Sequence, residues 1–204
     1  MKKPGSMKTL EDLGRVRLSE NFFLRDFLHS EIADFYGMPN IPDDPDLAIA
    51  AGAKLCEELL EPLQRTFGRL HIRSGYRSRS VNDFGNRNKL NCSTNAASAA
   101  DHIWDMRDAD GCMGATACIV IPWVWDRRAT LGWQSLAWWI HDHLPYASLC
   151  FFPRLWAVNI QWHERPVRRI RSYIAPAGLL TKDGMANQSG SHAAFYEGFP
   201  VFKG

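Results

Sequence analysis

Three segments of the chain carry apolar residues at helical spacing. The clearest lies between residues 45 and 68, and Gly68 follows it as a stop signal. Its apolar positions recur at four-residue steps: Leu47, Ala51, Leu55, Leu59 and Leu63. Pro62 is expected to end or bend the last turn, because proline lacks the backbone N–H. Residues 18–37 and 133–145 show similar periodicity and are also predicted to be helical.

Four further segments alternate between apolar and polar residues or are rich in β-branched residues, and we predict strands there. They are residues 69–78, 97–107, 116–126 and 155–166. In the last of them, Val158, Ile160 and Trp162 fall on one face, and Asn159, Gln161 and His163 fall on the other. This segment is therefore predicted to be a strand with one apolar and one polar face.

The predicted strand over residues 97–107 follows a run of small residues, "CSTNAASAAD". A period of two places Asp101, Ile103 and Asp105 on one face of this strand, and His102 and Trp104 on the other. Small side chains let backbones approach closely, so the acidic and imidazole groups that follow them are a candidate site for a ligand or an ion.

The order of these elements predicts an α+β fold in which N-terminal helices pack on a small, mainly antiparallel sheet. We expect residues 1–17 to form a flexible leader and residues 18–177 to form a single domain. Residues 178–204 are rich in Gly, Ser, Asn and Lys, which favours a loosely packed tail.

Composition narrows the class of protein. The 204 residues are 46% hydrophobic and 23% charged, with a net charge of +2, as in an ordinary globular protein. The basic stretch 165–171, "RPVRRIR", is interpreted as a solvated surface, which disfavours a nucleic-acid partner without excluding one. No apolar run is long enough to span a bilayer, and no membrane association is expected. Five cysteines without CxxC spacing favour a cytoplasmic protein with reduced thiols.

Arginine, aspartate and amide side chains mark the candidate chemistry. Arg77 follows the glycine turn of "SGYRS", where a guanidinium is suited to clamp a carboxylate through two parallel hydrogen bonds. Asp101 lies on one predicted strand, and Asn159 lies on the polar face of another. These hydrogen-bonding side chains are suited to hold a small polar ligand.

These pieces resemble the M15 family of zinc D-Ala-D-Ala carboxypeptidases and dipeptidases, which includes cell-wall peptidases. The resemblance covers residues 18–171 and rests on four segments: "LSENFFLRDFLHSEIADFYGMPNIP", "LCEELLEPLQRTFGRLHIRSGYRS", "SAAD" and "WAVNIQW". It implies an M15-like fold, with Asp101 as a zinc ligand on the central metal strand and Arg77 in the substrate cleft.

The chain departs from the family at two of the three zinc ligands. The family pattern Ser-x-His-x-x-Gly-x-Ala-x-Asp, aligned on Asp101, places Thr94 where the histidine belongs and Ala97 where the glycine belongs. In the closing strand, Asn159 stands where the second histidine belongs. Zn²⁺ prefers nitrogen or sulfur ligands beside carboxylate, so the usual triad is not encoded.

Two interpretations follow. In the first, the cleft is kept without zinc, and the protein binds a small polar or peptide-like ligand with altered or lost hydrolase activity. In the second, a metal-dependent cell-wall peptidase survives with substitute ligands, Asp101 together with His102 or His163. A pseudoenzyme that binds a protein or nucleic-acid partner is a further alternative. His141 and His143 precede Pro145. They either face a cleft or lie at the end of the helix, where the helix dipole favours a charged imidazole, and the sequence leaves both roles open.

The predicted site is therefore a defined set of residues. The candidate catalytic residues are Arg77, Asp101 and His102. The candidate ligand-binding residues are Tyr76, Ser78, Thr94, Asp105, Asn159, Gln161 and His163. No cofactor is assigned, and zinc is retained only as an alternative.

Overall fold

In the computed structural model, which describes residues 1–204, six strands form one open sheet in the order β1-β2-β4-β3-β5-β6. The strands are β1 (His71–Ser74), β2 (Gly114–Val120), β3 (Ser148–Phe151), β4 (Val158–His163), β5 (Arg169–Ser172) and β6 (Gly178–Thr181). All neighbours are antiparallel except β3 and β5, which are parallel. The α+β class and the mostly antiparallel sheet are thus confirmed.

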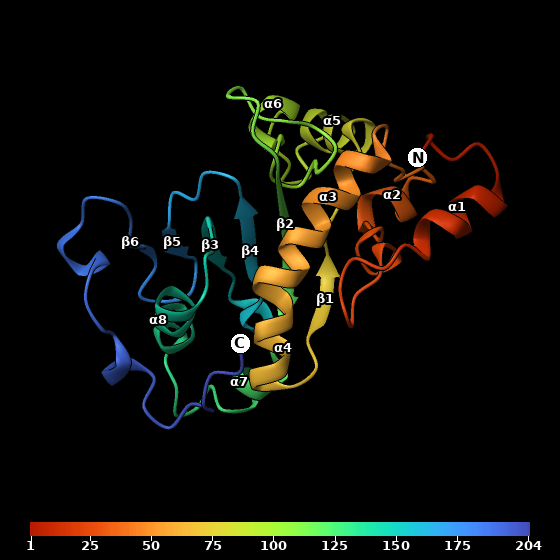
Figure 1. Cartoon of the computed structure of the whole chain (residues 1–204). Helices are drawn as coiled ribbons and strands as arrows, with labels where there is room; N and C mark the ends of the chain where they lie inside the picture. The colour runs from red at the N-terminus through yellow and green to blue at the C-terminus, as the bar shows by residue number, and fades with distance from the viewer.

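α-Helices pack around this sheet. They are α1 (Met7–Gly14), α2 (Glu31–Phe35), α3 (Pro45–Leu55), α4 (Glu61–Phe67), α5 (Arg79–Arg87), α6 (Asn95–Ser98), α7 (Pro122–Asp126) and α8 (Trp133–His143). The α3–α4 helix crosses in front of β2, with β1 beside it, and α3 contacts β2 and β4, while α8 lies near β3 and β5 (Figure 1). The core lies between these helices and the inward side chains of the strands, such as Ala117, Leu149 and Ile160. The opposite face of the sheet is left to polar side chains.

The long helix predicted over residues 45–68 is confirmed, but Pro62 does not end it. Asp44 caps the first turn by accepting a hydrogen bond from the Leu47 N–H, and Gly68, at φ 85°, terminates the last. Between α3 and α4 the helix widens into one π-helical turn, Cys56–Leu60. This turn ends two residues before Pro62, and the helix continues beyond Pro62 to Phe67.

The strand predicted over residues 97–107 is wrong. These residues form the end of α6 and a compact turn, in which the N–H groups of Asp101 and Ile103 both donate to Ser98 O. Ala100 takes a left-handed conformation, with φ 52°. The consecutive residues Ile103, Trp104 and Asp105 are all buried. Successive side chains of this turn therefore point into the interior, whereas the predicted strand would place Trp104 and Asp105 on opposite faces.

Other predicted elements are shorter than expected. Residues 18–37 contain only a 3₁₀ turn, Leu24–Phe27, and the short α2. The strand predicted over 116–126 ends at Val120 as β2, because Pro122 begins α7. The helix over 133–145 and the strand over 155–166 are confirmed as α8 and β4.

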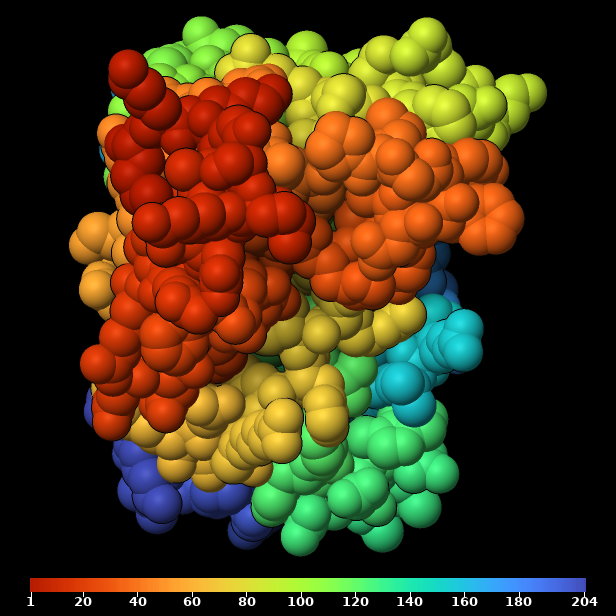
Figure 2. All heavy atoms as spheres, turned by 90° about the vertical axis from the view of Figure 1, so that its right-hand side faces the viewer, coloured from red at the N-terminus to blue at the C-terminus, as the bar shows by residue number.

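Both terminal segments contribute to the fold. Within residues 1–17, expected as a leader, Ser6 caps α1 and Leu13 is fully buried in the core. Within residues 178–204, expected to be loosely packed, β6 pairs with β5 and His192 is buried. Figure 2 shows the N-terminal segment in red and orange spread over one side of the molecule, with the C-terminal segment in blue at its lower edge. No helix has the length and apolar character that crossing a membrane requires.

Glu61 is a buried carboxylate that ties the N-terminal segment to the long helix. It accepts hydrogen bonds from Ser19 Oγ at 2.7 Å, Asn21 N at 2.7 Å and Asn21 Nδ2 at 2.8 Å. Burial acts to raise the pKa of Glu61, but these hydrogen bonds outweigh it and hold the pKa below its ordinary value of 4.5. The charged form is therefore the stable one in the folded protein.

We expect Glu61→Gln to lower the free energy of unfolding by about 2 kcal/mol at pH 7, because bonds to a charged acceptor are lost. Since the folded pKa is depressed, this contribution is present above pH 4.5 and is lost as pH falls through the folded pKa. Urea unfolding between pH 7 and pH 3 checks this, with the exposed Glu57→Gln as control. A gap between wild type and Glu61→Gln that stays constant down to pH 3 would contradict it.

Candidate functional site

The open face of the sheet carries polar side chains in two rows that run across the strands. The pairing of β2 with β4, β4 with β3, and β3 with β5 sets both rows. One row consists of Thr116, Gln161, Ser148 and Arg169, and the other of Cys118, Asn159, Cys150 and Arg171. Polar groups from four strands, distant in sequence, are thereby brought to one surface.

The turn of residues 99–106 docks on this surface and is held by hydrogen bonds from the backbone and from side chains. The Thr116 N–H donates to Asp101 O at 2.9 Å, and the Thr116 hydroxyl donates to the Asp101 carboxylate. Gln161 Nε2 donates to Ala100 O at 3.0 Å. On the other side, the Arg77 N–H donates to His102 O at 2.8 Å. The turn thus links β2, β4 and the loop after β1, and it places Asp101 and His102 over the polar rows.

A cavity of about 860 Å³ opens beside this turn. Its lining includes three guanidinium groups, a carboxylate, an imidazole and an amide, beside Asn91 and several hydroxyl groups. The first six groups belong to Arg73, Arg77, Arg171, Asp101, His102 and Asn159. None of the three arginines takes part in an ion pair within the protein. The cavity therefore has an excess of positive charge. We refer to it as the arginine cavity.

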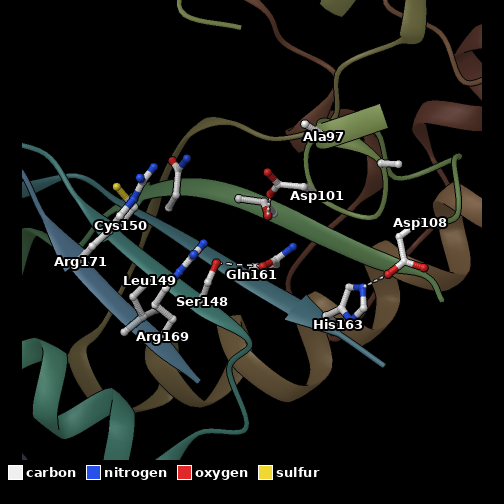
Figure 3. A pocket seen from close by; sticks show the side chains of 13 residues that line it. Ala97, Asp101, Asp108, Ser148, Leu149, Cys150, Gln161, His163, Arg169 and Arg171 are labelled. Carbon is white, nitrogen blue, oxygen red and sulfur yellow. Dashed lines mark hydrogen bonds and ion pairs between the residues drawn. The ribbon is translucent and has the colours of Figure 1, made fainter. Parts of the chain in front are cut away.

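A smaller cavity of about 240 Å³ adjoins the arginine cavity, because Asp101, Asn159 and Arg171 line both. Figure 3 shows Asp101 above this small cavity, with Arg169 and Arg171 rising from the sheet opposite. Cys150 also lines it, but burial raises the pKa of this thiol, which disfavours a thiolate nucleophile.

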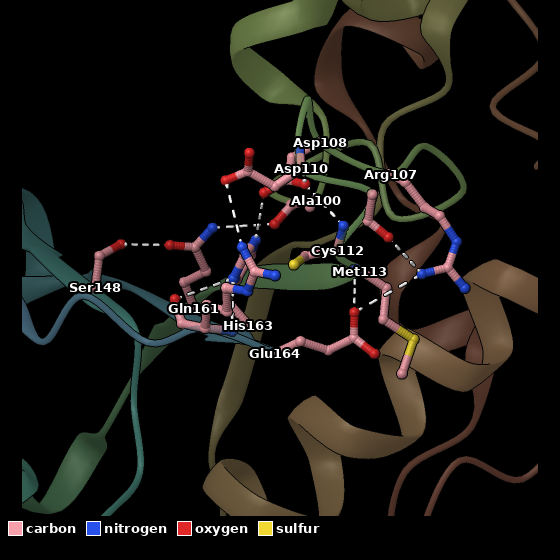
Figure 4. A network of polar contacts seen from close by, with 12 residues as sticks. Ala100, Arg107, Asp108, Asp110, Cys112, Met113, Ser148, Gln161, His163 and Glu164 are labelled. Carbon is pink, nitrogen blue, oxygen red and sulfur yellow. Dashed lines mark hydrogen bonds and ion pairs between the residues drawn. The ribbon is translucent and has the colours of Figure 1, made fainter.

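A polar network closes the end of the small cavity (Figure 4). Ser148 Oγ donates to Gln161 Oε1 at 2.8 Å, and His163 Nε2 lies 3.1 Å from Asp108 Oδ2. His163, a candidate partner for Asp101, is therefore engaged with Asp108 instead. Its ring is held on the other side by the Arg165 N–H, which donates to Nδ1 at 3.0 Å.

The contacts of His102 define its tautomer. Nδ1 lies 3.2 Å from Gly75 O, which can only accept, so Nδ1 carries the proton. Nε2 then accepts from Asn159 Nδ2 at 3.2 Å. Burial lowers the pKa of His102; the Asp101 carboxylate opposes this shift, and the Arg77 guanidinium adds to it. His102 is accordingly a neutral imidazole at pH 7, in direct contact with Asn159.

Arg77 is positioned by neutral partners. Its Nη1 donates to Asn82 Oδ1 at 3.1 Å and contacts Cys92 Sγ at the same distance. Neither partner neutralises the guanidinium charge. Asn82 is itself fixed by Ser93 O and Asn95, so the Arg77 side chain is anchored at the wall of the arginine cavity with its charge available to a ligand.

Four predicted ligand-binding residues line neither cavity. Tyr76 is buried and its hydroxyl donates to Asp105 Oδ1 at 3.1 Å. Asp105 also accepts from the Asp43 N–H at 2.6 Å, which ties the turn to the loop before α3. Ser78 and Thr94 are the N-caps of α5 and α6. All four polar side chains therefore stabilise the fold and are not directed at a ligand.

Sequence reasoning missed several residues of the site. Arg73 on β1 was not singled out, and Arg169 and Arg171 belong to the basic stretch that was interpreted as solvated surface. A signal for the last two exists in "RIR", since alternation places both arginines on one face around the buried Ile170. The local pattern does not show that β5 pairs with β3 in parallel, and this pairing is what brings the two arginines to the site.

The residues present do not fit a His-Asp-His zinc centre at Asp101. Thr94 caps a helix, and Asn159 directs its Nδ2 donor at His102. The Asp101 carboxylate accepts from Thr116, and His163 contacts Asp108. The chain does hold one trio of possible metal ligands, but it lies elsewhere, at His141, Asp142 and His192.

No family model, curated protein or solved structure matches this chain. Its function is therefore inferred from the chemistry of the cavities.

Proposed function

We propose that this protein binds a small, peptide-like ligand with a free carboxylate in the arginine cavity, and that hydrolase activity of the M15 type is altered or lost. The observation that carries the proposal is the set of three guanidinium groups without ion-pair partners around one cavity, beside a single carboxylate. Guanidinium groups bind carboxylates through two parallel hydrogen bonds, which supports an anionic ligand group.

The other lining groups favour a peptide over a simple anion. Asn159 Nδ2 is used by His102, which leaves Oδ1 to accept from a ligand amide N–H. Asp101 supplies a negative charge suited to a ligand ammonium group. The volume of about 860 Å³ falls within the range of small-molecule sites, about 300–1,000 Å³. A dipeptide offers an ammonium, an amide and a carboxylate in that order.

The M15 resemblance supports the same ligand class, while the donor set argues against the family's zinc chemistry at this position. Asp101 and His102 are the groups available for proton transfer beside the ligand. His102 is neutral, but its Nε2 lone pair is occupied by Asn159, so it is not poised to take a proton without a change at Asn159. Binding is therefore the activity that these contacts support best.

Isothermal titration calorimetry with the dipeptide D-Ala-D-Ala and with its C-terminal amide tests the proposal. We expect the free acid to bind, and the amide to bind roughly 10- to 100-fold more weakly, because hydrogen bonds between charged groups are lost. Equal affinity for the two forms, or no binding of the acid, would contradict the proposal. Release of free alanine during the titration would favour the alternative of an active peptidase.

Replacing Arg77 with alanine should weaken D-Ala-D-Ala binding by a similar factor and leave the melting temperature nearly unchanged. The reason is that the guanidinium contacts only Asn82 and Cys92 within the protein. Arg87→Ala is the matched control, since Arg87 is exposed on α5 and pairs with Asp83 away from both cavities. A large fall in the melting temperature of Arg77→Ala would mark Arg77 as a structural residue instead.

A further inference from the structure

A histidine and aspartate cluster joins the C-terminal segment to α8, and none of its residues lines the arginine cavity. His141 and Asp142 lie near the end of α8, and His192 comes from the C-terminal segment. One possible ligand atom from each of the three residues lies within 4.8 Å of the others. His141 and His192 are buried, and the Asp142 side chain is 13% exposed.

We propose that His141, Asp142 and His192 bind a divalent transition metal, with Zn²⁺ as the best match. Two imidazole nitrogens and one carboxylate oxygen are ligands that Zn²⁺ takes in proteins. Tetrahedral coordination at bond lengths of about 2.0–2.1 Å places ligand atoms about 3.4 Å apart. The metal would therefore widen the His192–Asp142 contact of 2.6 Å and hold the trio, whose ligand atoms lie within 4.8 Å of one another, at that spacing. The inference is independent of the ligand proposed for the arginine cavity.

Hydrogen bonds from neighbouring groups already orient the side chains of His192 and Asp142 within the cluster. His192 Nε2 contacts Asn187 O at 2.9 Å, which leaves Nδ1 directed at Asp142 Oδ1, 2.6 Å away. The second carboxylate oxygen, Asp142 Oδ2, accepts from Tyr196 Oη at 2.8 Å. Metal-binding histidines and carboxylates in proteins are oriented by hydrogen bonds of this kind on their far side.

The His141 ring lies between two polar groups. Nδ1 is 2.6 Å from Tyr146 Oη, and Nε2 is 2.8 Å from Gln188 O. One of these contacts yields when the metal binds, and the other then orients the ring. At His192, the metal takes the place of the proton that Nδ1 now shares with Asp142, and that proton is released to solvent.

A cavity of about 560 Å³ borders the cluster and is lined by His141 and Asp142. It gives solvent access to a fourth coordination position, since the protein supplies three ligands. The bound metal would fasten residues 187–192 to α8 more firmly than the stacking of His192 on Trp138, at 4.0 Å between ring centroids, does alone. The site therefore has a structural consequence that can be measured.

The test uses the full chain without an affinity tag, stripped of metal by a chelator and then dialysed. Titration with Zn²⁺ is followed by calorimetry, and titration with Co²⁺ by the visible absorption of tetrahedral cobalt. We expect one metal ion per chain and greater resistance of the C-terminal segment to limited proteolysis. A wild-type protein that takes up neither ion, or shows no tetrahedral cobalt absorption, would overturn the proposal.

Variants locate the metal. His192→Ala and Asp142→Asn should each weaken Zn²⁺ binding at least tenfold, and Tyr196→Phe should weaken it less, since Tyr196 acts only through Asp142. His102→Ala is the matched control, because it removes an imidazole next to Asp101, and it should bind Zn²⁺ like wild type. Loss of binding in His102→Ala with retention in His192→Ala would overturn the assignment. If His192→Ala does not fold, the proposal is tested by the Zn²⁺ affinity of Tyr196→Phe and by the cobalt spectrum of the wild type. Wild-type affinity in Tyr196→Phe together with no tetrahedral cobalt absorption would then overturn it.

Discussion

Replacing Trp104 with alanine should lower the free energy of unfolding by about 3–5 kcal/mol, the usual loss for a large aromatic residue in a core. Trp104 is fully buried and packs against Phe27 at 5.2 Å between ring centroids. Its Nε1 donates to Thr116 O at 3.1 Å, so the substitution also leaves a buried backbone acceptor without a partner.

Urea unfolding of Trp104→Ala beside Phe35→Ala measures this effect, since Phe35 is 81% exposed and its loss should change stability little. Trp104 belongs to the turn that carries Asp101 and His102, so D-Ala-D-Ala binding should weaken as well. A loss of stability below 1 kcal/mol would mean that the turn does not depend on this side chain, in conflict with its burial.

Gly114→Ala should destabilise the protein by about 1–3 kcal/mol and displace the turn over the sheet, which makes it the second large effect. A Cβ at this position would lie 2.2 Å from Ala100 O, 3.0 Å from Trp162 O and 2.8 Å from His163 Cδ2. Two of these three atoms are backbone and cannot swing away as a flexible side chain does. The Ala100 carbonyl also accepts from Gln161, so moving it disturbs the floor of the small cavity.

Gly5→Ala is the control for Gly114→Ala, because nothing lies within 4 Å of a Cβ at residue 5. Unfolding curves and the amide resonance of Thr116, whose N–H donates to Asp101 O, check the result. An unchanged Thr116 resonance together with wild-type stability would show that the strand and the turn are not packed as closely as described.

The parts of the fold that the sequence predicts are those with strong periodicity over many residues. The helix from residue 45 to Gly68 and the alternation in β4 both depend on burial of one face, which repeats visibly along the chain. Residues 97–107 alternate too, but there the pattern arises from a turn whose N–H groups converge on Ser98 O. A short alternating run cannot distinguish these two structures.

The candidate site was predictable where a residue type carried its chemistry locally. Arg77, Asp101, His102 and Asn159 do meet at one cavity, although His102 was expected on the face opposite Asp101. That expectation depended on the strand that proved to be a turn. Polar residues that serve the fold, such as Tyr76 and Asp105, could not be told apart from ligand-binding ones by residue type.

Contacts between distant segments were not accessible from the sequence. His192 lies in the segment that was expected to be loosely packed, but Asp142, 50 residues earlier, fixes it. His143, left open beside His141, turns to Trp139, where Nδ1 lies 2.8 Å from the backbone oxygen. Likewise, Arg171 reaches the arginine cavity only because β5 pairs with β3. Such pairings follow from topology and leave no local pattern.

The binding of a carboxylate-bearing dipeptide in the arginine cavity is tested most directly by ¹H–¹⁵N NMR during titration with D-Ala-D-Ala. The proposal predicts that the Arg77 Nε and Asn159 side-chain amide resonances shift in a saturable way. It also predicts that the indole resonance of Trp125, which lines neither cavity, does not shift. Shifts confined to other surfaces, with Arg77 and Asn159 unchanged at saturation, would contradict the proposal.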